Sequence, residues 1–189
     1  MNRKDSIVFS PGQIGPLEIK NRLVRSATFE NAATSEGAVS DFLVNLYRDL
    51  AQGGVGLIIT GIAGVYPGAL APPFLMRADD DSFIPSLARI PRAVHEVAPD
   101  CRVVLQLHHP GRQIIDEESG PKLMPLLPRA WMAYLQKHPE LLTPSPEAHR
   151  VAEATAPSAV HDTFFDRTPR AVTPTEIEQI IGAFAEGII

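Results

Sequence analysis

A run of ten residues, Val103–Arg112, combines a strand-forming start with side chains suited to binding a ligand. Its first residues are apolar and favour a buried strand. Four polar residues then lie around a Pro-Gly pair that ends the strand: Gln106, His108, His109 and Arg112. Because α/β enzymes bind ligands at the carboxyl ends of parallel strands, this pattern fits a ligand site. A strand that runs into an ordinary polar loop explains the same residues, and the pattern alone leaves both interpretations open.

Three apolar runs are expected to form strands, at residues 22–27, 55–60 and 102–107. Two segments between them have apolar residues at helical spacing. The first begins after Ser40, which can cap a helix, and ends at Gly53-Gly54. Its apolar face consists of Leu43, Leu46, Tyr47, Leu50 and Ala51. The second covers 84–98, with Pro91 in its first turn or at a kink. This alternation predicts an α/β fold with a parallel sheet and helices outside.

Both ends of the chain carry further elements. Two short extended pieces, at 7–9 and 17–19, flank turn residues and predict a hairpin. Near the C-terminus, Thr173, Pro174 and Glu176 form the start signal of a helix with a capping box. Its apolar stripe consists of Ile177, Ile180, Ile181, Phe184 and Ile188. Such a stripe needs a sheet to pack on, and the next strand of a βα series is expected after it.

A long irregular region at 108–172 holds half of the chain's 18 prolines. Its central part, 113–155, is expected to be a proline-rich excursion within the domain. A short helix is expected at 129–135, and an exposed acidic loop at 116–118. Because loops of this length are uncommon in compact domains, the region is predicted to be functional or mobile.

The composition is that of an ordinary globular domain. The 189 residues are 44% hydrophobic and 21% charged, which suffices for one sizeable core. The net charge of −5 and the lack of a basic block argue against a nucleic-acid partner. No signal peptide or bilayer-spanning run is visible, so no membrane partner is expected. The single cysteine, Cys101, fits a reducing, cytoplasmic location.

Several common catalytic motifs are absent from the sequence. It contains no P-loop, no Gly-x-Gly-x-x-Gly after a strand and no Gly-x-Ser-x-Gly elbow. The histidines lack the His-Glu-x-x-His spacing of zinc proteases. On a strand, His108 and His109 would point to opposite faces, which makes them poor joint ligands. We therefore expect no metal site.

Five sequence blocks stand out over nearly the whole chain. They are Ile-Gly-Pro-Leu-Glu-Ile-Lys-Asn-Arg-Leu-Val-Arg-Ser-Ala-Thr (14–28), Gly-Gly-Val-Gly-Leu-Ile-Ile-Thr-Gly (53–61), Gln-Leu-His-His-Pro-Gly-Arg (106–112), Ala-Pro-Ser-Ala-Val (156–160) and Pro-Arg-Ala-Val-Thr-Pro-Thr-Glu-Ile (169–177). In this order they resemble the Old Yellow Enzyme family of NADH:flavin oxidoreductases. The resemblance implies that residues 1–189 are the N-terminal part of a single FMN-binding TIM (β/α)8 barrel domain, about three β/α units plus a hairpin. It also implies hydride transfer from NADH or NADPH, through flavin N5, to a small-molecule acceptor such as an activated alkene.

Site residues follow from the resemblance position by position. The end of the first barrel strand, which lies along the flavin, matches Ser26, Ala27, Thr28 and Phe29. Ile62 matches a position that contacts the flavin mainly through its backbone. Gln106 matches a glutamine that hydrogen-bonds the pyrimidine edge, a role that suits an amide because it both donates and accepts. His108 matches a substrate-facing position, and Arg112 is expected to hold its loop.

The sequence departs from the family at several positions. Proline is common in the family where Ala27 stands, and an aromatic residue where His108 stands. Phe29 replaces a Thr or Cys that tunes the flavin potential, and its ring cannot hydrogen-bond the flavin, which points to an altered acceptor or potential. The resemblance covers about half of the family fold, since a complete barrel needs about 250 residues. The family's catalytic pair and phosphate-binding loops correspond to positions beyond Ile189.

Two other interpretations fit the same residues. One is a truncated, non-catalytic half-barrel that binds FMN weakly or not at all without a partner or the remaining strands. Its open sheet edge and apolar faces predict unfolding or self-association, for example as a homo-oligomer. The other is a different barrel enzyme that shares only the architecture, since fold does not imply function.

Overall fold

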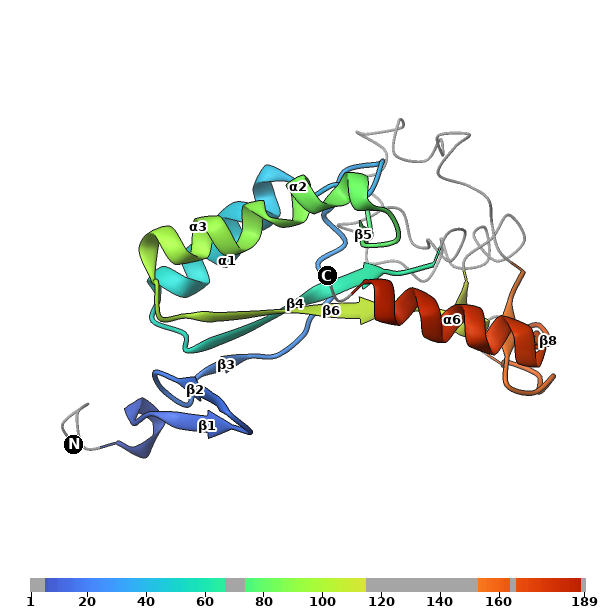
Figure 1. Ribbon diagram of the computed structural model, residues 1–189, viewed down its shortest axis with the longest axis horizontal. Helices are drawn as coiled ribbons and strands as arrows, with labels where there is room; N and C mark the ends of the chain where they lie inside the picture. Colours follow the sequence, from blue (N-terminus) through green and yellow to red (C-terminus); the bar gives the residue numbers. More distant parts are fainter. Residues whose placement is uncertain (1–5, 67–73, 115–152, 164–165, 188–189) are drawn as a thin grey trace.

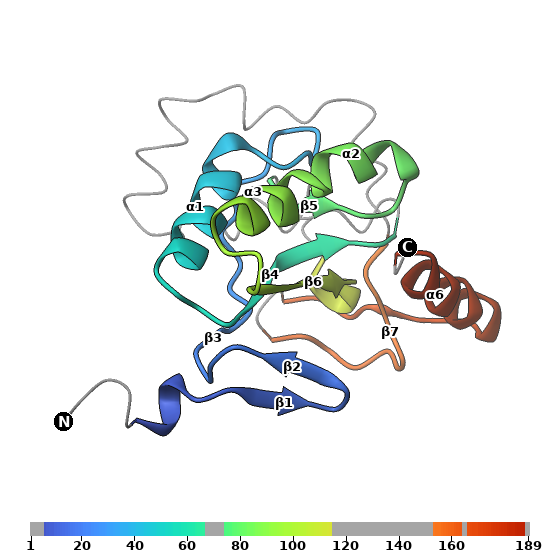
Figure 2. The ribbon, with the colours of Figure 1, turned by 60° about the vertical axis from the view of Figure 1, so that its left-hand side comes forward.

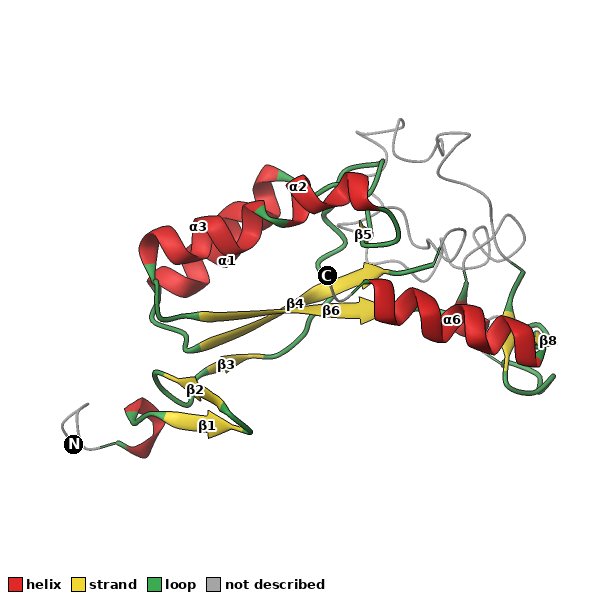
Figure 3. Cartoon of the chain, viewed as in Figure 1, coloured by secondary structure: helices red, strands yellow, loops and turns green. Residues whose placement is uncertain are grey.

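The structure, a computed structural model, describes residues 6–66, 74–114, 153–163 and 166–187 (Figure 1). The expected helix at 129–135, the acidic run at 116–118 and most of the proline-rich excursion lie outside these residues. In the part that the structure describes, a parallel sheet carries helices on one face, as the alternation of elements predicted (Figure 3).

The sheet at the centre of the molecule consists of β3 (Val24–Arg25), β4 (Leu57–Gly64) and β6 (Arg102–His108). β4 lies in the middle and pairs in parallel with both neighbours. A further two-residue strand, β5 (Met76–Arg77), pairs in parallel with the end of β4. All three expected strands are confirmed. The first is shorter than predicted, because only Val24 and Arg25 pair with β4 before the chain leaves the sheet.

Helices α1 (Asp41–Gln52) and α3 (Arg89–Val97) lie side by side over one face of this sheet (Figures 1 and 2). The Ser40 hydroxyl accepts a hydrogen bond from the backbone N–H of Leu43, which confirms the predicted cap. The buried core between helices and sheet includes Leu43, Tyr47 and Ala51 of α1, Ile90 and Val94 of α3, and Ile58 of β4. This core holds α1 and α3 against the sheet.

The second expected helix is divided in two. α2 (Ile84–Leu87) and α3 are separated by a turn at Ala88, which changes the phase of the helical repeat. Ile84 and Val97, two of the apolar residues whose spacing indicated a helix over 84–98, are 46% and 41% exposed. Pro91 lies in the first turn of α3, where its missing N–H costs no intrahelical hydrogen bond.

An N-terminal hairpin lies beside the sheet, near the start of β3 (Figure 2). Its strands are β1 (Gly12–Ile14) and β2 (Leu17–Ile19), joined by a turn in which Gly15 has a φ of 54°. The hairpin is confirmed, but Ile7–Phe9 forms a 3-10 helix, η2, instead of its first strand. The N–H of Phe9 bonds the Ser6 carbonyl, so this segment satisfies its backbone locally.

The C-terminal part contains two short strands and a helix. β7 (Thr155–Ala156) pairs in parallel with β8 (Arg170–Ala171). The expectation that 108–172 is irregular throughout is therefore wrong, because this region contains both strands. The N–H of Arg170 donates to the Ala154 carbonyl and the N–H of Val172, directly after β8, donates to the Ala156 carbonyl, and these bonds hold the pair together. Besides η2, two further 3-10 turns are described: η3 (Asp81–Phe83) and η4 (Gly111–Gln113).

Helix α6 (Pro174–Glu186) has the predicted start. The Thr173 hydroxyl accepts from the N–H of Glu176 at 3.3 Å, and the Glu176 carboxylate accepts from the N–H of Thr173 at 2.7 Å. None of the residues described in this helix is buried, and Ile177 and Ile181 are 43% and 56% exposed. Ile180 and Phe184 are partly buried, so the described residues cover the apolar stripe of α6 only in part.

Candidate functional site

The carboxyl ends of β3, β4 and β6 lie at the same end of the sheet (Figure 1). Every predicted site residue lies in the last part of one of these strands or directly after it. Ile62 is the register partner of Gln106, and Gly64 is that of His108. Val103 and Leu105 pack toward the helices, so Gln106 and His108 lie on the opposite face of β6 by strand alternation. Two parallel strands therefore present Ile62, Gln106 and His108 on a common face.

The segment at 26–29 continues from β3 without regular structure. Ser26 and Thr28 are exposed, and the Thr28 hydroxyl donates to the Ser26 carbonyl at 3.3 Å. Ala27 is partly buried, and the Phe29 ring is 37% exposed. Because no side chain before Phe29 is larger than threonine, a planar ligand can approach the backbone of this segment closely.

A bulge interrupts β4 between this segment and β6. Ile59 pairs with Val104 and Ile62 with Gln106, so two residues of β4 stand opposite the single Leu105. Those residues are Thr60 and Gly61. The Thr60 hydroxyl accepts from the N–H of Gln106 at 3.2 Å and donates to the Gly61 carbonyl at 2.8 Å. The bulge thereby turns Ile62 onto the same face as Gln106.

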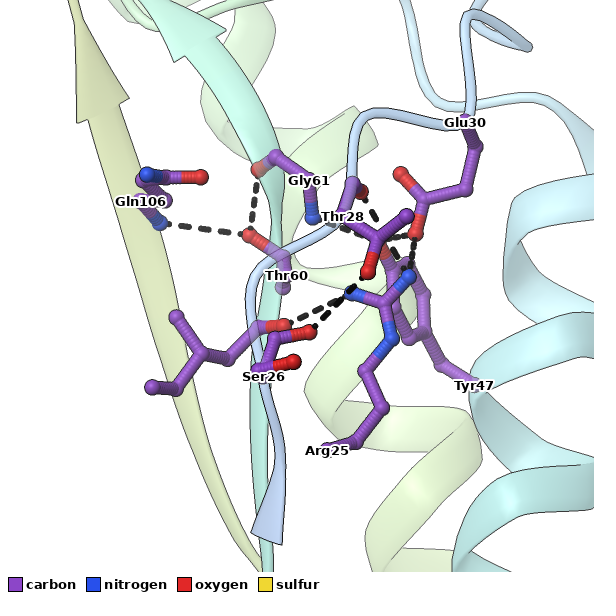
Figure 4. A network of polar contacts seen from close by, with 9 residues as sticks. Arg25, Ser26, Thr28, Glu30, Tyr47, Thr60, Gly61 and Gln106 are labelled. Carbon is purple, nitrogen blue, oxygen red and sulfur yellow. Dashed lines mark hydrogen bonds and ion pairs between the residues drawn. The ribbon is translucent and has the colours of Figure 1, made fainter.

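A network of buried polar groups holds the other side of the bulge (Figure 4). The Tyr47 hydroxyl of α1 accepts from the N–H of Gly61 at 2.8 Å and donates to the Glu30 carboxylate at 2.9 Å. Glu30 also forms an ion pair with Arg25, and their side chains are 10% and 14% exposed. Arg25 donates to the Ile59 carbonyl at 2.8 Å. Burial raises the pKa of the Tyr47 phenol well above its usual range, so the hydroxyl stays protonated.

The two histidines after β6 have different surroundings. Burial lowers the pKa of both imidazoles, and for His109 the neighbouring His108 adds to this effect. The Nδ1 atom of His109 accepts from the N–H of Gly111 at 3.1 Å, which assigns a neutral ring with its proton on Nε2. The His109 ring also packs edge-on against Tyr66, with ring centroids 5.5 Å apart. His109 thus supports its own loop.

Gln106 and His108, in contrast, keep their polar atoms available. Within residues 6–66, 74–114, 153–163 and 166–187, neither the Gln106 amide nor the His108 imidazole forms a hydrogen bond. Both side chains are partly buried. A partly buried amide and a neutral imidazole on one face are suited to bind a ligand that both donates and accepts.

Arg112 lies in η4, beyond the strand end. Its guanidinium donates to the Val160 carbonyl at 3.3 Å, and its own carbonyl accepts from Arg167 at 2.9 Å. Both contacts tie the loop after β6 to the segment before β8. Arg112 therefore has a structural contact and is not part of the face that carries Gln106.

Sequence reasoning missed the network of Arg25, Glu30, Tyr47 and Gly61. Tyr47 was placed correctly on the apolar face of α1, but its phenol needs a hydrogen-bond partner when buried. Arg25 inside an apolar strand was a second available signal, because charged residues are rarely buried without a partner. The bulge itself has no such signature in the sequence.

Two features of the described residues bear on metal binding and on membrane insertion. Among these residues, no group of three or more His, Cys, Asp or Glu side chains is arranged to hold a metal ion. In the same part of the chain, no helix is both long enough and apolar enough to cross a membrane.

Comparisons with known proteins identify the family. The sequence model of the NADH:flavin oxidoreductase / NADH oxidase family matches residues 7–187. An NADH oxidase of Thermoanaerobacter brockii is 31% identical over 96% of this chain and 23% of its own length. A metal reductase of Desulforamulus reducens is also 31% identical, over 96% of this chain and 22% of its own length.

A solved structure supports the same fold. Old Yellow Enzyme from Pichia sp. AKU4542 superposes with a TM-score of 0.69 at 21% identity, over 97% of this chain and 42% of that protein. This likeness confirms a partial (β/α)8 barrel, in which β3, β4 and β6 are the first three strands. The chain spans less than half the length of these relatives. It belongs to the NADH:flavin oxidoreductase / NADH oxidase family.

Proposed function

We propose that this chain forms the FMN-facing N-terminal part of an oxidoreductase that transfers hydride from NADH or NADPH to a small acceptor such as an activated alkene. The observation that carries the proposal is the common face of Ile62, Gln106 and His108 beside the small-residue segment at 26–29. The relative named NADH oxidase supports NADH as the donor. Bound FMN would supply the hydride-transfer chemistry, while the protein supplies position and electrostatics.

The donor set at this edge fits the chemistry of an isoalloxazine ring. The pyrimidine edge of the ring presents donors and acceptors together, and the amide of Gln106 offers both. Ile62 brings a backbone and an apolar side chain to the same face. The backbone at 26–28 can lie along the plane of the ring, since no large side chain blocks it. These residues would bind and orient FMN.

His108 is assigned to the acceptor molecule. Its imidazole is half-buried, and burial lowers its pKa, so the ring is neutral at pH 7. A neutral imidazole can both donate to and accept from a polar group of the acceptor. Phe29 offers only an apolar ring where a hydrogen-bonding residue would tune the flavin, so Phe29→Thr should change the midpoint potential of bound FMN. An unchanged potential contradicts this assignment of Phe29.

A non-catalytic half-barrel is the second candidate. Val24 and Val104 face away from the helices and are each 44% exposed, and the α6 stripe is covered only in part. These surfaces favour association with the remaining strands or with a second copy of the chain. In this case the chain would bind FMN only in the presence of that partner.

A binding experiment separates the two candidates. FMN is titrated into the purified chain, with flavin fluorescence and visible absorption as readouts, and the sample is desalted and mixed with NADH. The proposed function predicts a retained flavin band that NADH bleaches. Gln106→Glu removes the amide donor and should weaken FMN binding by about tenfold or more. Gln52→Glu, at the exposed end of α1, is the matched control and should bind like the wild type. No FMN binding by the wild-type chain would contradict the proposal.

A further inference from the structure

The bulge in β4 brings together two backbone segments that the proposed function places beside FMN. One is the segment at 26–29, after β3, and the other is Ile62, which directly follows Gly61 of the bulge. A bulge removes ladder hydrogen bonds, so the N–H and carbonyl of Gly61 need other partners. Two side-chain hydroxyls supply them: Thr60 bonds the carbonyl, and Tyr47 bonds the N–H. The position of Gly61 therefore depends on side chains and not on the regular ladder.

The contact between the two segments leaves no space for a side chain. A Cβ atom added to Gly61 would lie 2.9 Å from the Thr28 carbonyl oxygen and closer still to Oε2 of Glu30. Both of those atoms belong to the chain that continues from β3. The segment at 26–29 therefore packs directly on the backbone of the bulge.

Arg25 and Glu30 fasten the segment at its two ends. The Arg25 guanidinium donates to the Ile59 carbonyl at 2.8 Å and to the Thr28 carbonyl at 3.4 Å, and it pairs with Glu30. It also lies over the Tyr47 ring, 5.5 Å from its centroid. Charge-assisted hydrogen bonds in a buried setting hold their geometry well, and removal of one partner leaves the other charge unpaired.

We infer that Arg25, Glu30 and Tyr47 are positioning residues that fix the segment at 26–29 against the bulge at Gly61-Ile62 and thereby set the backbone that faces FMN. The inference rests on the proposed function. None of the three residues carries the chemistry. They act through Gly61 and through residues 26–29, which a ligand would touch.

Tyr47→Phe is the direct test, because it removes one hydroxyl and keeps the buried ring. The Gly61 N–H then loses its acceptor and should exchange with solvent about tenfold faster or more in NMR hydrogen-exchange measurements. The amide resonances of 26–29 should shift, and the dissociation constant for FMN should rise about tenfold with a displaced flavin absorption band. Tyr66→Phe is the matched control: among the described residues its hydroxyl has no hydrogen bond, and all three readouts should stay unchanged.

The outcomes separate the positioning role from the proposed function. Unchanged Gly61 exchange in Tyr47→Phe overturns the inference. Faster exchange with wild-type FMN affinity and absorption also overturns it, because the network is then only structural. If the wild-type chain binds no FMN, the proposed function fails. The positioning role is then tested by the amide resonances of 26–29 in Tyr47→Phe: a shift relative to the wild type supports the inference, and no shift overturns it.

Glu30→Gln serves as a second variant if Tyr47→Phe does not fold. The amide keeps an acceptor for the Tyr47 hydroxyl and removes only the charge that pairs with Arg25. Shifted resonances at 26–29 with an intact Gly61 hydrogen bond are the expected result. Resonances identical to those of the wild type would overturn the role of Arg25 and Glu30.

Discussion

Helices α1 and α6 begin alike and are buried very differently. Each has a hydroxyl cap, Ser40 or Thr173, and each carries an apolar stripe. Tyr47 of α1 is fully buried against β4 and α3, whereas Ile181 of α6 is 56% exposed. The start signal and the stripe are sufficient for a helix, but burial depends on which elements lie beside it. The covered region around α1 is also the one that holds the strand ends in place.

The largest difference between the two regions is expected when an ion pair is broken and the loss of unfolding free energy is measured. Glu30→Ala leaves the buried Arg25 guanidinium without its partner and should lower the free energy of unfolding by about 3 kcal/mol. Glu153→Ala breaks an exposed pair with Arg170 near α6 and should have little effect. Denaturant unfolding of both variants measures this. Equal losses of unfolding free energy in the two variants would show that the Arg25–Glu30 pair stabilises the fold no more than an exposed ion pair does.

Removal of an apolar side chain should also lower the free energy of unfolding much more in α1 than in α6. Leu43→Ala opens a cavity beneath α1 and should lower the free energy of unfolding by about 3 kcal/mol. Ile181→Ala removes an exposed side chain and should change it by less than about 0.5 kcal/mol. The same unfolding experiment applies. A loss of more than about 2 kcal/mol for Ile181→Ala would mean that the stripe of α6 is covered in solution, for example in an oligomer.

The two caps allow a matched comparison of similar local effects. Ser40→Ala and Thr173→Ala each remove one hydroxyl acceptor, worth about 1 kcal/mol. For α1 the loss should appear in global unfolding, because the helix is part of the core. For α6 it should appear as faster amide exchange in the first turn only. Global destabilisation by Thr173→Ala would contradict the independence of α6.

The start of α6 should also respond to pH, with the smallest effect. The Arg170 guanidinium and, after it, the Thr173 N–H lower the pKa of Glu176 from 4.5 to about 2. Because the folded-state pKa is depressed, Glu176 stabilises the start of the helix above about pH 4.5, and this contribution is lost as the pH falls toward 2. NMR titration of the Glu176 carboxyl and of the Thr173 amide tests this. A midpoint near 4.5 would contradict the contacts of Glu176 with Arg170 and with the Thr173 N–H in solution.

Much of this architecture could be predicted from local patterns. Apolar runs located the three strands, and hydroxyl caps located α1 and α6, because these signals depend on a few neighbouring residues. The polar residues at the end of β6 were found in the same way. The division at Ala88 and the conformation of 7–9 were missed, since each depends on a single turn that many sequences adopt. The bulge at Thr60-Gly61 could not be predicted because it arises from contacts among β3, α1 and β6.

The family resemblance supplied what local patterns could not. It identified the barrel from its first three strands, although strands β3, β4 and β6 alone do not close. It also named Ile62 and Gln106 together, which the register of β4 and β6 later placed opposite each other. The family resemblance did not predict the network of Arg25, Glu30 and Tyr47, because these residues are recognised only when their side chains are seen in contact.

The most direct test of the account is a map of FMN binding on the chain. Amide resonances of the wild-type chain are followed by NMR as FMN is added, with Gln106→Glu as the weakened variant. The account predicts shifts at residues 26–29, Ile62 and Gln106, which require more FMN in the variant. Shifts confined to the exposed stripe of α6, or equal titrations of the two proteins, would contradict an FMN site at the carboxyl ends of β3, β4 and β6.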